Sequence, residues 1–227
     1  MSYHKFDFHL HSRFSYDSLS SITGILKASR RMELSGIALT DHEKMEGANK
    51  LESAKLSRDM LIIRGIEVKT EYGDMIGLFL RSPVITSSFH EFVLSVKKQG
   101  GIVVLPHPFK TFQSIPEFVL KSIEIIEVQN SRLTEAQNRK AVQFAMKRGI
   151  PMIAGSDAHR ISQVGRSWVE FESIDNMDDL KEQLLSGAGS IKGNSSPRYD
   201  HYWSSLIGNL RKRTLLKTLA RKTKAFF

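Results

Sequence analysis

Two histidines near the start of the chain, His9 and His11, are the sharpest local feature that could do chemistry. They lie two residues apart at the end of an apolar run, Tyr3–Leu10, that we expect to be a strand. Because side chains alternate between the faces of a strand, both imidazoles and Asp7 are expected on one face. An H-x-H pair alone is a weak sign of a metal site, since two polar residues at a solvated strand end give the same pattern.

The same design, an apolar run followed by a ligand-type side chain, recurs along the chain. Gly-Ile-Ala-Leu-Thr precedes Asp41 and His42, and Leu-Ile-Ile-Arg-Gly-Ile precedes Glu67. Separate hydrogen-bonding roles for these residues are the alternative, but that alternative must explain each position independently. The full set of polar residues that follow apolar runs is Asp7, His9, His11, Asp41, His42, Glu67, His107, Glu127, Asp157 and His159.

The ligand types narrow the metal and the chemistry. The chain has no cysteine, which excludes thiolate sites and disulfides. Imidazole and carboxylate ligands suit Zn²⁺, Mn²⁺ or Fe²⁺ and give Ca²⁺ no advantage. Two ions about 3.5–4 Å apart, bridged by a carboxylate, are the usual arrangement for hydrolysing phosphate esters with a metal-activated water. We therefore expect two or three divalent ions (Mn, Fe or Zn) and a hydrolase.

The elements that position these residues alternate between strand-like and helix-like segments, which predicts an α/β fold. A barrel and a doubly wound sheet both fit this alternation. Ligands after many different strands favour a barrel rim, because a doubly wound sheet gathers its site at one crevice. The expected strands are Tyr3–Leu10, Gly36–Thr40, Met60–Glu67, Met75–Leu80, Ile102–Leu105, Ile123–Val128, Pro151–Gly155 and Trp168–Phe171. The expected helices are Ile22–Glu33, Lys44–Arg58, His90–Lys98, Thr134–Arg148 and Asp178–Leu185.

The length of 227 residues suits one barrel domain, which we place at residues 1–197, ending in a Gly/Ser/Pro-rich linker, Ser186–Pro197. The net charge of +9 is concentrated in a tail, residues 198–227, where seven Lys/Arg and no acid follow His201. No signal-peptide pattern and no apolar run of membrane-spanning length is visible, so a cytoplasmic location is expected.

The tail reads as a helix in which Trp203, Leu206, Ile207 and Leu210 share one face. Three interpretations stay open. The tail could be a terminal helix packed on the barrel, an attachment for RNA or DNA, or an attachment for an anionic membrane surface.

Taken together, the motifs resemble those of the PHP family (polymerase and histidinol phosphatase), in family order over residues 7 to 159. The resemblance rests on Asp7-Phe8-His9-Leu10-His11 followed by Phe14-Ser15-Tyr16-Asp17, on Thr40-Asp41-His42, on Gly65-Ile66-Glu67, on His107-Pro108 and on Ser156-Asp157-Ala158-His159. Asp17 stands where some relatives have histidine and where short single-domain phosphoesterases of the family resemble this chain.

The resemblance implies a distorted (β/α)7 TIM-like barrel with a trinuclear metal site at the C-terminal rim of its strands. By this resemblance, His9, His11, Glu67 and Asp157 hold one metal. Glu67 bridges to a second metal bound by His107, and Asp17, His42 and His159 hold a third. Among these residues we expect Glu67 to be catalytic as the bridge, and His42 or His159, or their metal, to assist the leaving group.

One position departs from the family. Asp74 stands where many relatives have a histidine ligand of the second metal. Aspartate can still ligate, and as a harder ligand it would favour Mn²⁺ or Fe²⁺ over Zn²⁺. The alternative is that Asp74 is only a turn residue.

Recognition of a small phosphorylated substrate calls for cations near the rim. Arg13, Lys69, Lys110, Arg132 and Arg160 follow strand ends, and Arg132 and Arg160 are the preferred pair because the planar guanidinium suits phosphate. Each could instead be a solvated surface residue.

The leading functional hypothesis is therefore a phosphoesterase acting on a phosphorylated metabolite, a nucleotide or a short oligonucleotide. A metal-dependent C–N or C–O hydrolase of amidohydrolase type and a non-catalytic PHP-like binding module are the alternatives. The near-complete ligand set argues against the binding module.

Overall fold

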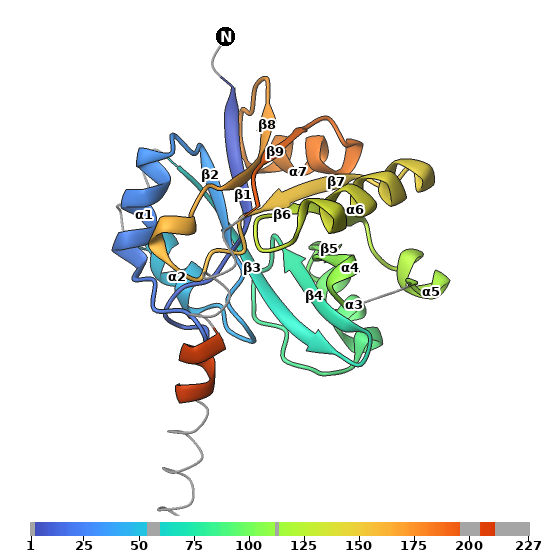
Figure 1. Ribbon diagram of the computed structural model, residues 1–227, viewed down its shortest axis with the longest axis horizontal. Helices are drawn as coiled ribbons and strands as arrows, with labels where there is room; N and C mark the ends of the chain where they lie inside the picture. The colour runs from blue at the N-terminus through green and yellow to red at the C-terminus, as the bar shows by residue number, and fades with distance from the viewer. Residues whose placement is uncertain (1–2, 54–59, 112–113, 196–204, 212–227) are drawn as a thin grey trace, which may run out of the picture.

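A single mixed sheet organises the computed structural model, which describes residues 3–53, 60–111, 114–195 and 205–211 (Figure 1). Within these residues the strand order is β7-β6-β5-β4-β3-β2-β1-β8-β9. The strands are β1 (His4–Leu10), β2 (Gly36–Leu39), β3 (Leu61–Thr70), β4 (Gly73–Leu78), β5 (Ile102–Leu105), β6 (Ile125–Asn130), β7 (Met152–Gly155), β8 (Ser167–Phe171) and β9 (Ser190–Gly193).

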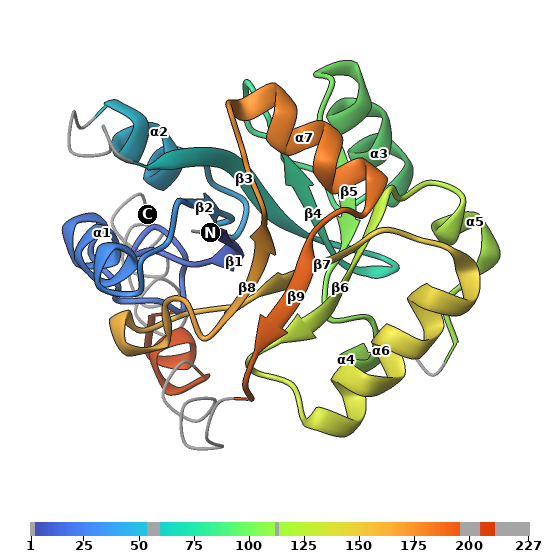
Figure 2. The same ribbon diagram turned by 90° about the horizontal axis from the view of Figure 1, so that it is seen from above.

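The first seven strands lie side by side in chain order around the barrel. The first and last of them, β1 and β7, meet only at their C-terminal ends. Leu10 and Ala158 form a parallel bridge, and Asp157 N donates to His9 O at 2.8 Å, which joins β1 to the end of β7. At the other end, β8 pairs antiparallel with His4–Phe6 of β1, and β8 and β9 both contact β7. The sheet is thus a nearly closed, distorted barrel, which confirms the predicted fold class, with two antiparallel strands added at the open seam (Figure 2).

Helices cover the outside of this sheet. They are α1 (Ile22–Arg31), α2 (Glu46–Ser53), α3 (Phe89–Lys98), α4 (Pro108–Thr111), α5 (Glu117–Leu120), α6 (Glu135–Arg148), α7 (Met177–Ser186) and the 3₁₀ helix η1 (Ile161–Gln163). Their ends carry ordinary signals: Thr134 and Gln137 form a capping box at the start of α6, and Gly149 ends it at φ 63°. Residues 205–211 are also helical.

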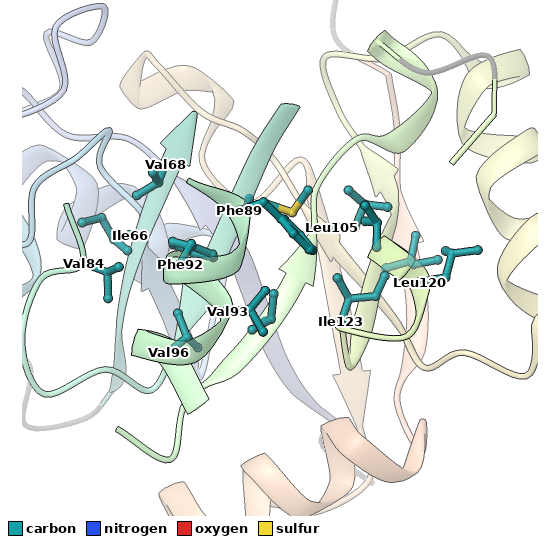
Figure 3. Packing of buried hydrophobic residues seen from close by; sticks show 14 of the residues in the cluster. Ile66, Val68, Val84, Phe89, Phe92, Val93, Val96, Leu105, Leu120 and Ile123 are labelled. Atoms are coloured by element: carbon teal, nitrogen blue, oxygen red, sulfur yellow. The ribbon is translucent and has the colours of Figure 1, made fainter. Parts of the chain in front are cut away.

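Apolar side chains fix the strands from both faces. Ile66, Val68 and Leu105 belong to one buried apolar cluster with Phe92 and Val96 of α3 (Figure 3). A second cluster contains Phe6, Phe8, Ile63, Ile76, Val104 and Phe171, with Phe6 and Phe171 edge to face at 5.8 Å. Burying side chains of this size contributes about 1.5–3 kcal/mol each to the stability of the barrel.

One predicted element needs correction, three short helices were not predicted, and one expected helix lies partly outside the described residues. The expected linker Ser186–Pro197 contains a strand, because Ser190–Gly193 pairs with β8. Four residues with one apolar side chain are too short to show a strand period, so this edge strand was not predicted. The short helices α4, α5 and η1 were also not predicted, and the expected helix Lys44–Arg58 is described only as Glu46–Ser53, since residues 54–59 lie outside the described part.

The tail is described only in part. Its residues 198–204 and 212–227, including Trp203, lie outside the described residues, and 205–211 form the helical segment. In the described part of the chain, none of the helices has the length and apolarity needed to cross a membrane.

Candidate metal centre

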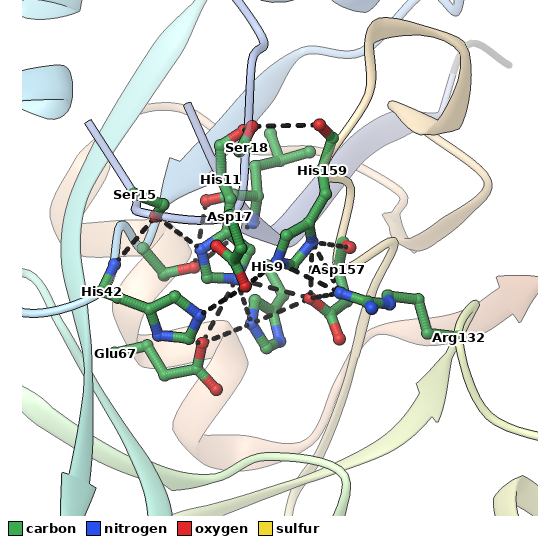
Figure 4. A network of polar contacts seen from close by, with 12 residues as sticks. His9, His11, Ser15, Asp17, Ser18, His42, Glu67, Arg132, Asp157 and His159 are labelled. Carbon is green, nitrogen blue, oxygen red and sulfur yellow. Dashed lines mark hydrogen bonds and ion pairs between the residues drawn. The ribbon is translucent and has the colours of Figure 1, made fainter. Parts of the chain in front are cut away.

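Histidines and carboxylates, most of them buried, gather where the barrel closes, at the C-terminal ends of the parallel strands and the N-terminal end of β4 (Figure 4). They form overlapping groups whose ligand atoms lie within 4.8 Å of one another. These groups are His9, His11 and Glu67; Glu67, Asp74 and His107; His11, Asp17, His42 and His159; and His9, His107 and Asp157. Every metal ligand predicted from the sequence is therefore brought into one cluster.

The first group is built on β1 and β3. His9 Nε2 lies 3.1 Å from His11 Nε2 and 3.4 Å from Glu67 Oε2, and His11 Nε2 lies 3.2 Å from the same oxygen. Asp157 Oδ1 approaches the two imidazoles at 3.7 and 3.4 Å. Two imidazole nitrogens that face each other and two carboxylates are the expected surroundings of a shared cation.

Glu67 also reaches the second group. Its Oε1 lies 3.2 Å from His107 Nε2, whereas its Oε2 faces His9 and His11. The two oxygens of one carboxylate thus point to two groups, which is the geometry of a bridging ligand. Asp74, on β4, belongs to this second group, so the structure places it where a ligand would stand.

The third group lies on loops beyond the strands. His159 Nε2 is 3.0 Å from Asp17 Oδ2, and His42 Nε2 is 3.4 Å from the same oxygen. The His11 ring lies between them, with centroids 4.3 Å from His159 and 4.5 Å from His42. His11 therefore stands at the border of the first and third groups.

Outer contacts orient three of the imidazoles in the same way. The Nδ1 atoms of His9, His11 and His159 lie near Glu127 Oε1 (3.0 Å), Ser15 Oγ (3.0 Å) and the Asp157 carbonyl (2.9 Å). A proton on Nδ1 of His9 and of His11 would leave their Nε2 lone pairs facing the cluster, whereas Nδ1 of His159 also lies 2.8 Å from Arg132 Nη1, which is itself a donor. Metal-binding histidines are held by such second contacts.

The residues fit divalent metals. Asp17 Oδ1 is a buried carboxylate oxygen with no hydrogen-bond partner among the described residues, so it has an unused ligand position. Burial opposes ionisation of Glu67 and Asp157, but nearby histidines, and Arg132 for Asp157, hold the pKa of both carboxyls well below its usual range. Buried anions of this kind require cations, which protons or metal ions supply.

The surrounding charges also shift the pKa values of the histidines. Burial lowers the pKa of His11, but the carboxylates of Asp157 and Glu67 outweigh burial and raise it to about 9. The pKa of His159 falls to about 4, because burial, His11 and Arg132 all oppose its protonation. The pKa values of two neighbouring imidazoles are thus shifted in opposite directions, and strongly perturbed pKa values are concentrated at functional sites.

Glu127 is the main residue that the sequence-based ligand list missed. Besides His9, it accepts hydrogen bonds from the His107 backbone N (2.8 Å) and from Asn130 Nδ2 (2.9 Å). Its place at the end of an apolar run was the available signal, and the structure puts it behind the ligands. Asp7 likewise supports the backbone, accepting from the backbone amides of Ser156 (2.8 Å) and Gly165 (3.0 Å).

The backbone adopts unusual conformations at the ligand cluster. His107 and Asp157 adopt positive φ values of 31° and 50°, which are sparsely populated for residues with side chains and concentrate at functional sites. Gly155 leaves room for the ligands, since a Cβ there would lie 2.2 Å from the His9 Cβ and 2.6 Å from Glu127 Oε1.

A cavity of about 410 Å³ opens onto the cluster. Of the three arginines predicted to bind phosphate, only Arg132 lines this cavity. Arg132 lines it, with Nη1 3.1 Å from His159 Nε2 and 3.7 Å from Asp157 Oδ1. Arg13 is exposed and does not line it, and Arg160 lines a neighbouring cavity of about 490 Å³. Lys69, Lys110, Tyr16 and Glu43 complete the rim, and of these only the lysines were considered from the sequence.

Comparison with known proteins agrees with this geometry. A family model described as the PHP domain matches residues 7–148, and a model described as PHP-associated matches residues 135–188. An uncharacterized protein from Methanocaldococcus jannaschii is 33% identical over 201 residues, which are 83% of this chain and 80% of that protein.

Solved structures share the fold at lower identity. A two-domain protein from Bacteroides vulgatus that contains a predicted PHP-like metal-dependent phosphoesterase aligns with a TM-score of 0.72 and 21% identity, over 85% of this chain but only 65% of that protein. An amidohydrolase from Chromobacterium violaceum, with bound sulfate and no metal, aligns with a TM-score of 0.60 and 17% identity, over 70% of this chain and 89% of that one.

The matched family model covers more than half of the chain, and its range contains His9, His11, His42, Glu67 and His107. Asp157 and His159 fall within the range of the PHP-associated model. The chain therefore belongs to the PHP-domain family, and the family together with the buried ligand groups supports a metal-dependent hydrolase.

Proposed function

We propose that this protein hydrolyses phosphate esters at the metal centre. The observation that carries the proposal is the combination of buried ligand groups with three cations, Lys69, Lys110 and Arg132, around one cavity of about 410 Å³. A phosphate group needs positive charge on its non-bridging oxygens, and an arginine fork with two ammonium groups provides it beside the metals. The volume suits a small phosphorylated metabolite or a nucleotide.

The ligands proposed for three divalent ions are those grouped above. Glu67 lies between the first and second groups, Asp74 and His107 complete the second, and Asp17, His42 and His159 surround the third with His11. When bound, such ions lower the pKa of water and neutralise charge on phosphoryl oxygens. The ligand set, without sulfur, suits Mn²⁺, Fe²⁺ or Zn²⁺.

The protein's own groups would position the substrate and handle the leaving group. Arg132, held beside Asp157 and His159 on the rim of the cavity, would contact the phosphoryl oxygens. Of the two histidines proposed to assist the leaving alkoxide, the His42 side chain is 19% exposed, whereas that of His159 is 3% exposed. His42 is therefore the better placed of the two to meet a substrate oxygen, and Tyr16 stacks on it at 4.9 Å.

A substrate screen tests the proposal. The protein with Mn²⁺, Fe²⁺ or Zn²⁺ is assayed on p-nitrophenyl phosphate, phosphomonoesters, nucleoside bisphosphates and short oligoribonucleotides. We expect turnover that His9→Ala abolishes. Bound metal without turnover of any phosphate ester would reject the proposal.

Arg132→Ala separates phosphate recognition from metal binding. Losing a charge-assisted contact should lower kcat/KM on a phosphomonoester roughly tenfold or more, with metal content retained. Arg13→Ala removes the same charge from an exposed position outside the cavity and should leave the kinetics close to wild type. Equal effects of the two substitutions would contradict the role given to Arg132.

A second candidate, hydrolysis of a C–N bond, is favoured by one observation, the structural likeness to an amidohydrolase. The bridging position in this chain is the carboxylate of Glu67, so no lysine carbamate is needed there. A parallel screen of cyclic amides and amides with the same metals distinguishes the two activities, since His9→Ala should abolish whichever is real.

A further inference from the structure

We propose that the C-terminal segment Ser205–Arg211 is part of the metal centre's framework, and that Arg211 is a positioning residue for the third ligand group. The inference rests on the metal centre proposed above, but not on the identity of the substrate. It assigns a role to a segment that lies outside every motif of the chain and outside the residues matched by the family models.

The stretch Ser15–Ser18 holds the third ligand group from its inner side. Ser15 Oγ donates to Asp41 Oδ1 at 2.9 Å, lies 3.0 Å from His11 Nδ1, and accepts from the His42 backbone N at 3.0 Å. Ser18 Oγ lies 3.0 Å from the carbonyls of His11 and His159. Asp17 stands between these serines, so this one stretch sets all four members of the group.

The C-terminal segment holds the same stretch from its outer side. Arg211 Nη1 donates to the carbonyls of Ser15 at 2.8 Å and Ser18 at 3.0 Å, and approaches that of Arg13 at 3.5 Å. Ser15 and Ser18 therefore contact the ligand residues through their hydroxyls and Arg211 through their backbone carbonyls. Hydrogen bonds from a charged donor are stronger than neutral ones, so this contact restrains the loop.

Gly208 brings the segment close to the ligand itself. A Cβ at this position would lie 3.2 Å from the Asp17 Cβ and 3.5 Å from two carbons of the Tyr16 ring. Tyr16 in turn stacks on His42, with ring centroids 4.9 Å apart and planes 23° apart. The backbone of the segment therefore supports Asp17 directly and His42 through one aromatic ring.

This arrangement explains how an accessible loop can present a carboxylate. The Asp17 side chain is 14% exposed and one of its oxygens has no hydrogen-bond partner among the described residues, so the contacts within the cluster fix only part of its position. The segment supplies the remaining restraint from a distant part of the sequence. The first and second groups are built on residues of β1, β3 and β4 and on His107 after β5, and His11 joins the first group to the third.

The test is metal binding by the full-length chain, measured by calorimetry with Mn²⁺ and by metal content after dialysis, with thermal unfolding recorded for every variant. Arg211→Met removes the charged donor but keeps the aliphatic stem. We expect the weakest-bound equivalent of Mn²⁺ to lose roughly tenfold or more in affinity, with the tighter equivalents unchanged. Arg211→Lys, which keeps the charge without the planar fork, should fall between Arg211→Met and wild type.

Two further variants complete the design. Asn209→Ala changes an exposed position of the same segment and should bind Mn²⁺ as wild type does. Gly208→Leu places a side chain against Asp17 and Tyr16 and should reproduce the loss seen with Arg211→Met. Agreement of these two different substitutions, with Asn209→Ala unaffected, supports the inference even if one variant loses stability.

Wild-type affinities for all equivalents in both Arg211→Met and Gly208→Leu would overturn the inference. It is also overturned, with the proposed function intact, if Asp17→Ala leaves metal binding unchanged while His9→Ala reduces it. Failure of the wild-type protein to bind any of the three metals would instead overturn the metal centre itself.

Discussion

The strand side and the loop side of the metal centre are built in different ways. On the strand side, His9, Glu67 and Asp74 project from β1, β3 and β4. On the loop side, Asp17, His42 and His159 follow strands and are placed by loops. The side chains of His9 and Glu67 are 0% and 3% exposed and those of Asp17 and His42 are 14% and 19% exposed, but burial does not divide the two sides strictly, because Asp74 is half-buried and the His159 side chain is 3% exposed.

The comparison shows that the ligands of one metal centre can be positioned in two ways, by strands on one side and by hydrogen-bonded loops on the other. Strand positions are fixed by backbone pairing and apolar packing, and the ligands there are further oriented by side chains of the same barrel, such as Glu127 beside His9. Loop positions depend on serine hydroxyls and on Arg211, which come from separate parts of the chain. Residues of both sides, among them Glu67 and Asp74 as well as Asp17 and His42, line the cavity of about 410 Å³ that a substrate would enter.

Glu67→Gln should have the largest effect, because it removes the one carboxylate shared by two groups. An amide cannot supply two anionic oxygens to His9, His11 and His107. We expect at least about a thousandfold loss of kcat and loss of more than one metal equivalent. Loss of a single equivalent, with activity close to wild type, would show that Glu67 does not bridge.

Gly155→Ala should damage the strand side nearly as much. The new Cβ would fall 2.2 Å from the His9 Cβ, so His9 or β7 must shift. A displacement of about 1 Å at a catalytic group can cost roughly a hundredfold in rate. The control is Gly149→Ala, which has nothing within 4 Å but a φ of 63°. Both variants should lose thermal stability, and only Gly155→Ala should lose metal affinity.

Glu127→Gln should have a smaller effect, since Glu127 acts through His9 and His107. Both of its oxygens accept hydrogen bonds, so in glutamine the amide NH₂, which is a donor, would face another donor on one side. We expect a roughly 10–100-fold loss of metal affinity, typical of residues that orient ligands. Glu172→Gln, at an exposed position, removes the same charge and should be silent. An effect of equal size in both would mean that only net charge matters.

Ser18→Ala should have the smallest effect and should fall on the loop side alone. It leaves the carbonyls of His11 and His159 without the Ser18 hydroxyl. We expect a loss of about 1–3 kcal/mol in the free energy of unfolding, measured in urea, and weakened binding of the last metal equivalent only. Weakening of the tightest equivalent would contradict the division between the two sides.

The sequence predicted the strand side well for a physical reason. An apolar run that ends in a ligand residue marks both a buried strand and its exit point, and Glu67 and His107 follow this rule. The barrel fold was predicted from the same positions. The ligand roles themselves stay predictions, although the structure brings together each residue that was named.

The support of the loop side could not be predicted, because it depends on contacts between distant segments. The hydroxyls of Ser15 and Ser18 carry no periodic signal, and Arg211 looked like one of several tail cations. The prediction of phosphate-binding arginines is limited for the same reason. Arg13, Arg132 and Arg160 all follow strands, and the shape of the loops decides that, of these three, Arg132 lines the cavity. The domain boundary at residue 197 and the partners of the tail stay predictions, since residues 212–227 lie outside the described part.

The seam between β1 and the end of β7 has a consequence for folding. The hydrogen bond from Asp157 N to His9 O joins the start of the barrel to its last ligand strand, so the ligand cluster exists only after nearly all of the barrel is in place. Contacts so distant in sequence form slowly. A metal that binds only the closed barrel would stabilise it by mass action, about 2.7 kcal/mol when the free metal exceeds the dissociation constant a hundredfold. The protein's lifetime in a cell would then follow the supply of metal.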